Sequence, residues 1–146
     1  MARRIPGIET RSLPEGLVTA AILVVDDEGL IRWSLKERLT AAGYEVVEAE
    51  TGLEALDAFA AGTPALVLLD LALPELDGLG VLRSVRRMAP ECPVIVMSAY
   101  DSPGSSAQAL ALGAAHFLPK PFDFDAVVGL VGATLAASGA GGLPAV

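Results

Sequence analysis

The chain has 146 residues, of which 53% are hydrophobic and 19% charged, as in one folded domain rather than a disordered chain. Eighteen acidic residues against ten basic ones give a net charge of −8, which argues against direct binding to nucleic acid or to a membrane. The single cysteine, Cys92, and the single histidine, His116, exclude a disulfide framework and metal centres with several Cys or His ligands. The apolar run 17–25 is too short to cross a bilayer, so we expect a cytoplasmic protein.

The two ends of the chain differ in composition from the part between them. Residues 1–20 hold three arginines together with prolines and glycines that interrupt any periodicity, and we expect a flexible leader there. Residues 138–146 are uncharged and rich in Ala and Gly, which predicts a linker or tail. The folded domain is therefore expected over residues 21–137.

Between these ends a short apolar run alternates with an amphipathic run. The apolar runs, whose length, β-branched residues and Gly or Pro borders favour strands, are 22–25, 45–49, 65–69, 93–97 and 116–118. Helical periodicity follows each of them, at 31–42, 55–59, 79–88, 105–112 and 124–135. This alternation predicts a doubly wound α/β fold, with a largely parallel five-stranded sheet and helices on both faces. Pro119 ends the fifth run, and because proline is tolerated mainly on edge strands, the fifth strand is expected at the border.

Polar side chains follow most of the predicted strands. They are Asp26, Asp27 and Glu28 after the first strand, Asp70 after the third, Ser98 after the fourth and Lys120 after the fifth. Ligands of such sheets bind beyond the carboxyl ends of the strands, so we expect these side chains to meet there. Carboxylates suit Mg²⁺, and a lysine with a hydroxyl suits a phosphoryl group. Since a carboxylate can itself accept a phosphoryl group, the sequence predicts a phosphoryl-transfer site built on an aspartate.

Four segments resemble the receiver domain of response regulators, the phosphoacceptor half of two-component signalling. They are LVVDDE at 23–28, DLALPELDG at 70–78, VIVMSAYD at 94–101 and FLPKPFD at 117–123. The resemblance implies a flavodoxin-like (βα)5 fold with strand order 2-1-3-4-5. Segments 31–39 and 117–125 are most similar to the receivers of nitrogen-regulatory-type transcription activators.

The resemblance also implies the acceptor and the metal ligands. Asp70 corresponds to the phosphorylated aspartate and to one Mg²⁺ ligand. Asp27 corresponds to a direct Mg²⁺ ligand, and Asp26 to a residue that acts through water. The main-chain carbonyl of Ala72 corresponds to the third protein ligand.

Four further positions match the family's switch and its lysine. Lys120 corresponds to the lysine that pairs with the phosphoryl oxygen. Ser98 corresponds to the catalytic and switch hydroxyl, and Phe117 to the switch aromatic residue. Pro121 corresponds to a proline that follows a cis peptide bond.

The implied function is a phosphorylation-dependent switch. A sensor histidine kinase donates the phosphoryl group to Asp70 with Mg²⁺ as cofactor, and the domain then changes its affinity for a partner. That partner is an effector domain beyond residue 146, a downstream protein or a second copy of the chain, in a system that regulates transcription. The protein is then not a turnover enzyme, because it catalyses transfer onto its own aspartate, with slow self-dephosphorylation.

Two other functions compete with this one. A Mg²⁺-dependent phosphohydrolase with an aspartyl-phosphate intermediate typically has a second acid two residues after the nucleophile, where Ala72 stands. A degenerate receiver that binds partners without phosphorylation lacks the acidic pair, the acceptor or the lysine, all of which are present here.

Three other charged features have structural interpretations. Asp77 is expected in a turn or at the start of a helix. Glu28 is expected either in the water shell of the metal or in solvent. Arg83, Arg86 and Arg87 are expected to form a solvated face of one helix.

Overall fold

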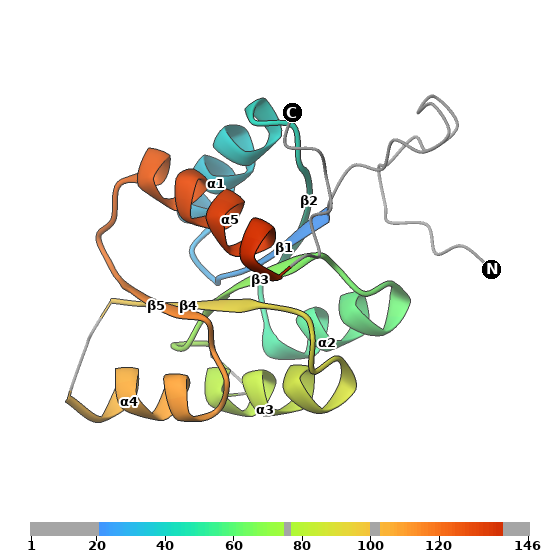
Figure 1. Ribbon diagram of the computed structural model, residues 1–146, viewed down its shortest axis with the longest axis vertical. Helices are drawn as coiled ribbons and strands as arrows, with labels where there is room; N and C mark the ends of the chain where they lie inside the picture. The colour runs from blue at the N-terminus through green and yellow to red at the C-terminus, as the bar shows by residue number, and fades with distance from the viewer. Residues whose placement is uncertain (1–20, 75–76, 100–102, 139–146) are drawn as a thin grey trace.

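The computed structural model describes residues 21–74, 77–99 and 103–138, in which strands and helices alternate along the chain (Figure 1). The strands are β1 (Ala21–Val25), β2 (Glu45–Ala49), β3 (Leu66–Asp70), β4 (Val94–Ser98) and β5 (His116–Pro119). The helices are α1 (Gly29–Ala41), α2 (Gly52–Ala61), α3 (Gly78–Met88), α4 (Pro103–Ala111) and α5 (Phe124–Ser138). The leader expected at 1–20 lies outside the described residues, as does the expected tail except Ser138, which ends α5.

The strands form one parallel sheet in the order β2-β1-β3-β4-β5, as predicted. β5 lies at the edge, where Pro119 pairs in register with Ser98. β3 and β4 begin and end one residue later than the apolar runs that predicted them, so Asp70 and Ser98 are the last strand residues. Main-chain pairing extends the strands because it does not depend on side-chain polarity: the Leu71 N–H donates to the Met97 carbonyl.

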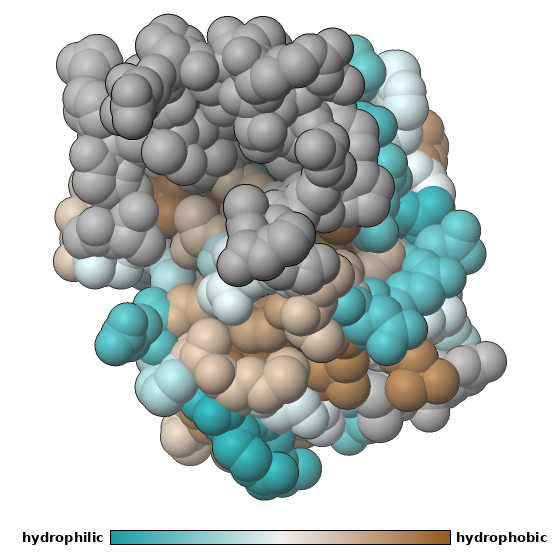
Figure 2. All heavy atoms as spheres, turned by 90° about the vertical axis from the view of Figure 1, so that its right-hand side faces the viewer, coloured by the Kyte–Doolittle hydropathy of each residue, from teal (hydrophilic) through white to brown (hydrophobic). Residues whose placement is uncertain are grey.

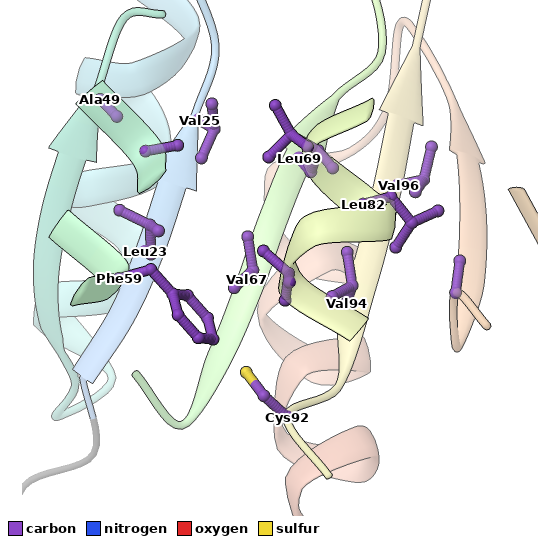
Figure 3. Close-up of a cluster of buried hydrophobic side chains, with 14 of the residues drawn as sticks. Leu23, Val25, Ala49, Phe59, Val67, Leu69, Leu82, Cys92, Val94 and Val96 are labelled. Carbon is purple, nitrogen blue, oxygen red and sulfur yellow. The ribbon is translucent and has the colours of Figure 1, made fainter. Parts of the chain in front are cut away.

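The strands bury alternate side chains on the two faces of the sheet. Ile22 and Val24 of β1 pack with α1 and α5, whereas Leu23 and Val25 pack with α2, α3 and α4. In Figure 1 the first pair of helices lies above the sheet and the other three lie below it. Figure 3 shows the cluster between the sheet and α2, α3 and α4, to which α2 contributes the ring of Phe59. Every residue of β1, β3 and β4 is buried, as expected for central strands of a doubly covered parallel sheet.

Glycine ends two of the helices in the left-handed region of the backbone. Gly43 follows α1 with φ of 102° and Gly113 follows α4 with φ of 103°. Gly62, which follows α2, has instead an extended φ of 177°. At that position any residue could adopt the backbone conformation.

The prediction that three arginines form a solvated face of α3 is wrong for Arg86. Arg86 is half-buried, and its guanidinium donates to the main-chain carbonyl of Cys92 and lies beside Gly113. Arg83 and Arg87 are exposed, as predicted. Within the described part of the chain, none of the helices is long and apolar enough to cross a membrane.

Candidate functional site

The predicted site residues come together at the carboxyl ends of the strands, on the left of Figure 1. Asp26 and Asp27 follow β1, Asp70 ends β3, and Lys120 follows β5 at the edge of the sheet. Figure 2 shows the opposite side of the molecule, where apolar side chains gather in the middle of the visible described surface and polar ones lie around them. Because the strands are parallel, their carboxyl ends bring together residues that are up to 94 positions apart in the sequence.

Three carboxylates form a cluster that fits a hard divalent cation. Oxygen atoms of Asp26, Asp27 and Asp70 lie within 4.8 Å of one another, with Asp27 exposed and the other two buried. The set contains only oxygen donors, which Mg²⁺ prefers, and the carboxylates repel one another unless a cation joins them. The three carboxylates among the predicted Mg²⁺ ligands thus suit that ion by their chemistry and by their spacing.

Lys120, the residue after β5, contacts the carboxylates. Its Nζ donates to Oδ2 of Asp26 at 2.8 Å, to Oε1 of Glu28 at 2.9 Å and to Oδ2 of Asp70 at 3.3 Å. The Lys120 side chain is 7% exposed. Burial acts to lower the pKa of Lys120, but its hydrogen bonds to Asp26 and Glu28 outweigh burial, and the pKa is raised above its ordinary value.

Asp70 is ionised with difficulty in this environment. Its burial raises the pKa of Asp70 from 3.8 to about 6, and the charge of Asp26 acts in the same direction. The N–H of Ala72, which donates to Oδ1 of Asp70 at 3.1 Å, and the nearby Lys120 act to lower this pKa. A cation bound beside Asp70 would favour its charged form, which is the form in which a carboxylate is a nucleophile.

The residues predicted to form the switch lie on neighbouring strands. Ser98 is 6% exposed at the end of β4, and Phe117 is half-buried in β5, where it packs against the cluster between the sheet and α2, α3 and α4. Val96 is the register partner of Phe117, two residues before Ser98. The Lys120–Pro121 peptide bond is cis, as the resemblance implies.

Gly78, the first residue of α3, lies very close to the end of β3. Asp77 caps α3, accepting a hydrogen bond from the Leu79 N–H at 3.2 Å, which confirms its predicted place at a helix start. Gly78 donates its N–H to the Leu71 carbonyl, and a Cβ at Gly78 would lie 2.4 Å from the Cα of Leu71. Glycine is required here by this close approach rather than by a positive φ.

Sequence reasoning did not assign two of the site's contacts. Arg32 donates to the main-chain carbonyl of Asp26 at 2.7 Å and to Glu48 and Glu50 at the end of β2, and so ties two loops together. Glu28 contacts Lys120 rather than facing only solvent. The signal that could have found Arg32 was two acids near the end of β2 opposite a cation in the first turn of α1.

Residues 22–131 match the family model of the response regulator receiver domain. Among curated proteins, the chain is 42% identical over 108 residues to the DNA-binding transcriptional regulator NtrC of Klebsiella pneumoniae. It is 41% identical over 114 residues to the response regulator MprA of Mycobacterium sp. strain KMS. These matches cover 74% and 78% of this chain, but only 23% of NtrC and 50% of MprA.

Solved structures give the same result. The chain superposes on NtrX from Brucella abortus with a TM-score of 0.78 and 35% identity, covering 83% of this chain and 28% of that one. It superposes on a CheY-like receiver domain protein from Methanospirillum hungatei JF-1 with a TM-score of 0.81 and 29% identity, covering 83% of this chain and 97% of that one. The fold predicted from the sequence is thus confirmed.

Proposed function

Because the chain belongs to the family of response regulator receiver domains, we propose that Asp70 is the residue that accepts the phosphoryl group. One observation carries this assignment. Of the two buried carboxylates in the cluster, Asp70 is the one that is itself the last residue of a central strand. Its Oδ2 lies 3.3 Å from the Lys120 ammonium. A nucleophile, a cation for the phosphoryl oxygens and two further acids for a metal are therefore available at one place.

The proposed donor is the phosphohistidine of a sensor histidine kinase. A carboxylate oxygen of Asp70 forms the new bond to phosphorus, and the bond from phosphorus to the histidine nitrogen breaks with its electron pair on the imidazole. Lys120 binds an oxygen of the transferring group and neutralises its charge. Asp27, Asp70 and the carbonyl of Ala72, with Asp26 acting through water, would hold Mg²⁺, which would supply further charge neutralisation.

The proposed consequence is a change in the affinity of this domain for a partner. Ser98 and Phe117 rearrange around the phosphoryl group and alter the surface of α4, β5 and α5. We propose that this partner is an effector domain beyond residue 146, a downstream protein or a second copy of the chain. We propose that the whole protein acts in the cytoplasm and regulates transcription. The relatives that are named as transcriptional regulators support the regulation of transcription.

Phosphorylation of the purified protein by acetyl phosphate and Mg²⁺ tests this proposal. We expect one phosphoryl group per chain, labile to hydroxylamine as acyl phosphates are, and no label after the substitution Asp70→Asn or after Mg²⁺ is removed with a chelator. Asp57→Asn, which removes an exposed acid on α2, is the matched control and should label like the wild type.

Two results would contradict the proposal. Undiminished labelling of Asp70→Asn would place the acceptor at another residue. Continuous release of phosphate at many turnovers per chain, in place of one stable label, would favour the phosphohydrolase.

A further inference from the structure

The ammonium of Lys120 already has a partner for each of its donors. A lysine ammonium carries three N–H groups, and here Nζ contacts the carboxylates of Asp26, Glu28 and Asp70. After transfer, the contact with Asp70 becomes a contact with the phosphoryl group attached to it. The donor approaches, however, while Asp70 is still a free carboxylate. At that stage Lys120 has to release one partner to bind a phosphoryl oxygen.

The three partners differ in what their release costs. The side chains of Asp26 and Asp70 are 0% and 3% exposed, so a charge left unpaired at either position stays away from water. The Glu28 side chain is 57% exposed, and its carboxylate can turn into solvent and be hydrated there. Glu28 is therefore the partner that Lys120 releases most easily.

We propose that Glu28 is a positioning residue that holds Lys120 before phosphoryl transfer and gives up its place on the ammonium to an oxygen of the incoming phosphoryl group. This inference rests on the proposed function of the site. It means that the contact between Glu28 and Lys120 stabilises the resting state and slows transfer. Loss of the contact should speed transfer from a small donor.

The contact can first be tested without metal or phosphoryl donor. Lys36 and Lys120 are the two lysines of the chain, so the lysine Cε groups give two assignable sets of signals in ¹H–¹³C spectra. In metal-free buffer, Glu28→Gln should move the Lys120 signals and leave those of Lys36, which pairs with Glu48, in place. Lys120 signals that do not respond to Glu28→Gln would overturn the inference, whatever the labelling shows.

The effect on transfer is measured by the rate of labelling with acetyl phosphate and Mg²⁺. Glu28→Gln should label about two- to fivefold faster than the wild type, the gain expected from losing one partly exposed ion pair. Glu28→Asp keeps the charge but is one methylene shorter, and it should also label faster. The matched control is Glu37→Gln, which removes an exposed acid on α1. It should label like the wild type.

The outcomes separate this inference from the proposed function. A wild-type protein that takes no label at Asp70 would refute the proposed function. A wild-type protein that labels, with Glu28→Gln equal to it or slower, would refute the inference alone. Faster labelling of Glu28→Gln and Glu37→Gln together, with Glu28→Asp unchanged, would assign the gain to net charge and would also refute the inference.

Discussion

A charge on Asp70 costs the folded protein free energy when no metal is bound. Burial is the largest cause of the raised pKa, and the neighbouring charge of Asp26 adds to it. Because the pKa of Asp70 is about 6 in the folded protein and 3.8 ordinarily, the folded state holds the proton more tightly than the unfolded chain. This contribution to stability is fully present below the lower of these values and is lost as the pH rises through the higher one.

Asp70→Asn should therefore stabilise the metal-free protein at neutral and alkaline pH. We expect a gain on the order of 2 kcal/mol in the free energy of unfolding at pH 8, shrinking toward zero near pH 4. Urea unfolding in the presence of a chelator at both pH values measures this difference. The exposed Asp57→Asn should change stability by less than about 0.5 kcal/mol at either pH. A gain that is equal at both pH values would show that ionisation of Asp70 is not its cause.

At the scale of single elements, the start of α3 packs closely against the end of β3. A Cβ at Gly78 would lie 2.7 Å from the Leu71 carbonyl oxygen and 2.8 Å from that of Asp70, both main-chain atoms. A side chain at position 78 would push α3 away from β3. The chain between these two elements carries Ala72. Helix packing and the site's geometry are thus coupled through one residue without a side chain.

Gly78→Ala should lower both stability and labelling. We expect a loss of about 1–3 kcal/mol in the free energy of unfolding, as for overpacked positions, together with slower labelling of Asp70. Gly129→Ala is the matched control in α5, because a Cβ at Gly129 would have no described atom of another element within 4 Å. It should gain about 0.5–1 kcal/mol from helix propensity and label normally. Urea unfolding and acetyl phosphate labelling of both variants measure these effects. A Gly78→Ala protein with wild-type stability would refute the close contact.

At the scale of the whole molecule, β4 and β5 join the proposed phosphoryl site to the face formed by α4 and β5. The main-chain carbonyl of Ser98 accepts from the Lys120 N–H at 2.7 Å, so the ends of β4 and β5 are joined beside the site. Phe117 in β5 and Ala109 in α4 belong to the same hydrophobic cluster. A change at Ser98 can thus reach α4 through packed side chains.

Ser98→Ala should separate labelling from switching. We expect labelling to fall by less than about tenfold, since the hydroxyl does not accept the phosphoryl group, while the change at α4 and β5 is reduced. Amide-resolved NMR with and without beryllofluoride, a mimic of the phosphoryl group, follows residues 107–113 and 116–118. Wild-type shifts at these residues in Ser98→Ala would show that the hydroxyl does not couple the site to this face.

The sequence by itself determined the fold and the location of the site. Alternating strand and helix periodicities, with right-handed crossovers between parallel strands, leave few topologies, and Pro119 indicated the edge strand. The carboxyl ends of parallel strands lie on the same side of the sheet. Asp26, Asp70 and Lys120 could therefore be grouped before their distances were known. These inferences are secure because they depend on local patterns and on chain connectivity.

Only the tertiary structure decided which charges pair and how strongly each is buried. Lys120 contacts Glu28, 92 positions away in the sequence, and Arg86, expected in solvent, binds the Cys92 carbonyl. Arg32 holds the carbonyl of Asp26. Such contacts depend on the reach of long side chains and on how neighbouring elements pack, and residue types along the chain do not specify either. The raised pKa of Asp70 follows for the same reason, because burial is a property of the assembled sheet and its helices.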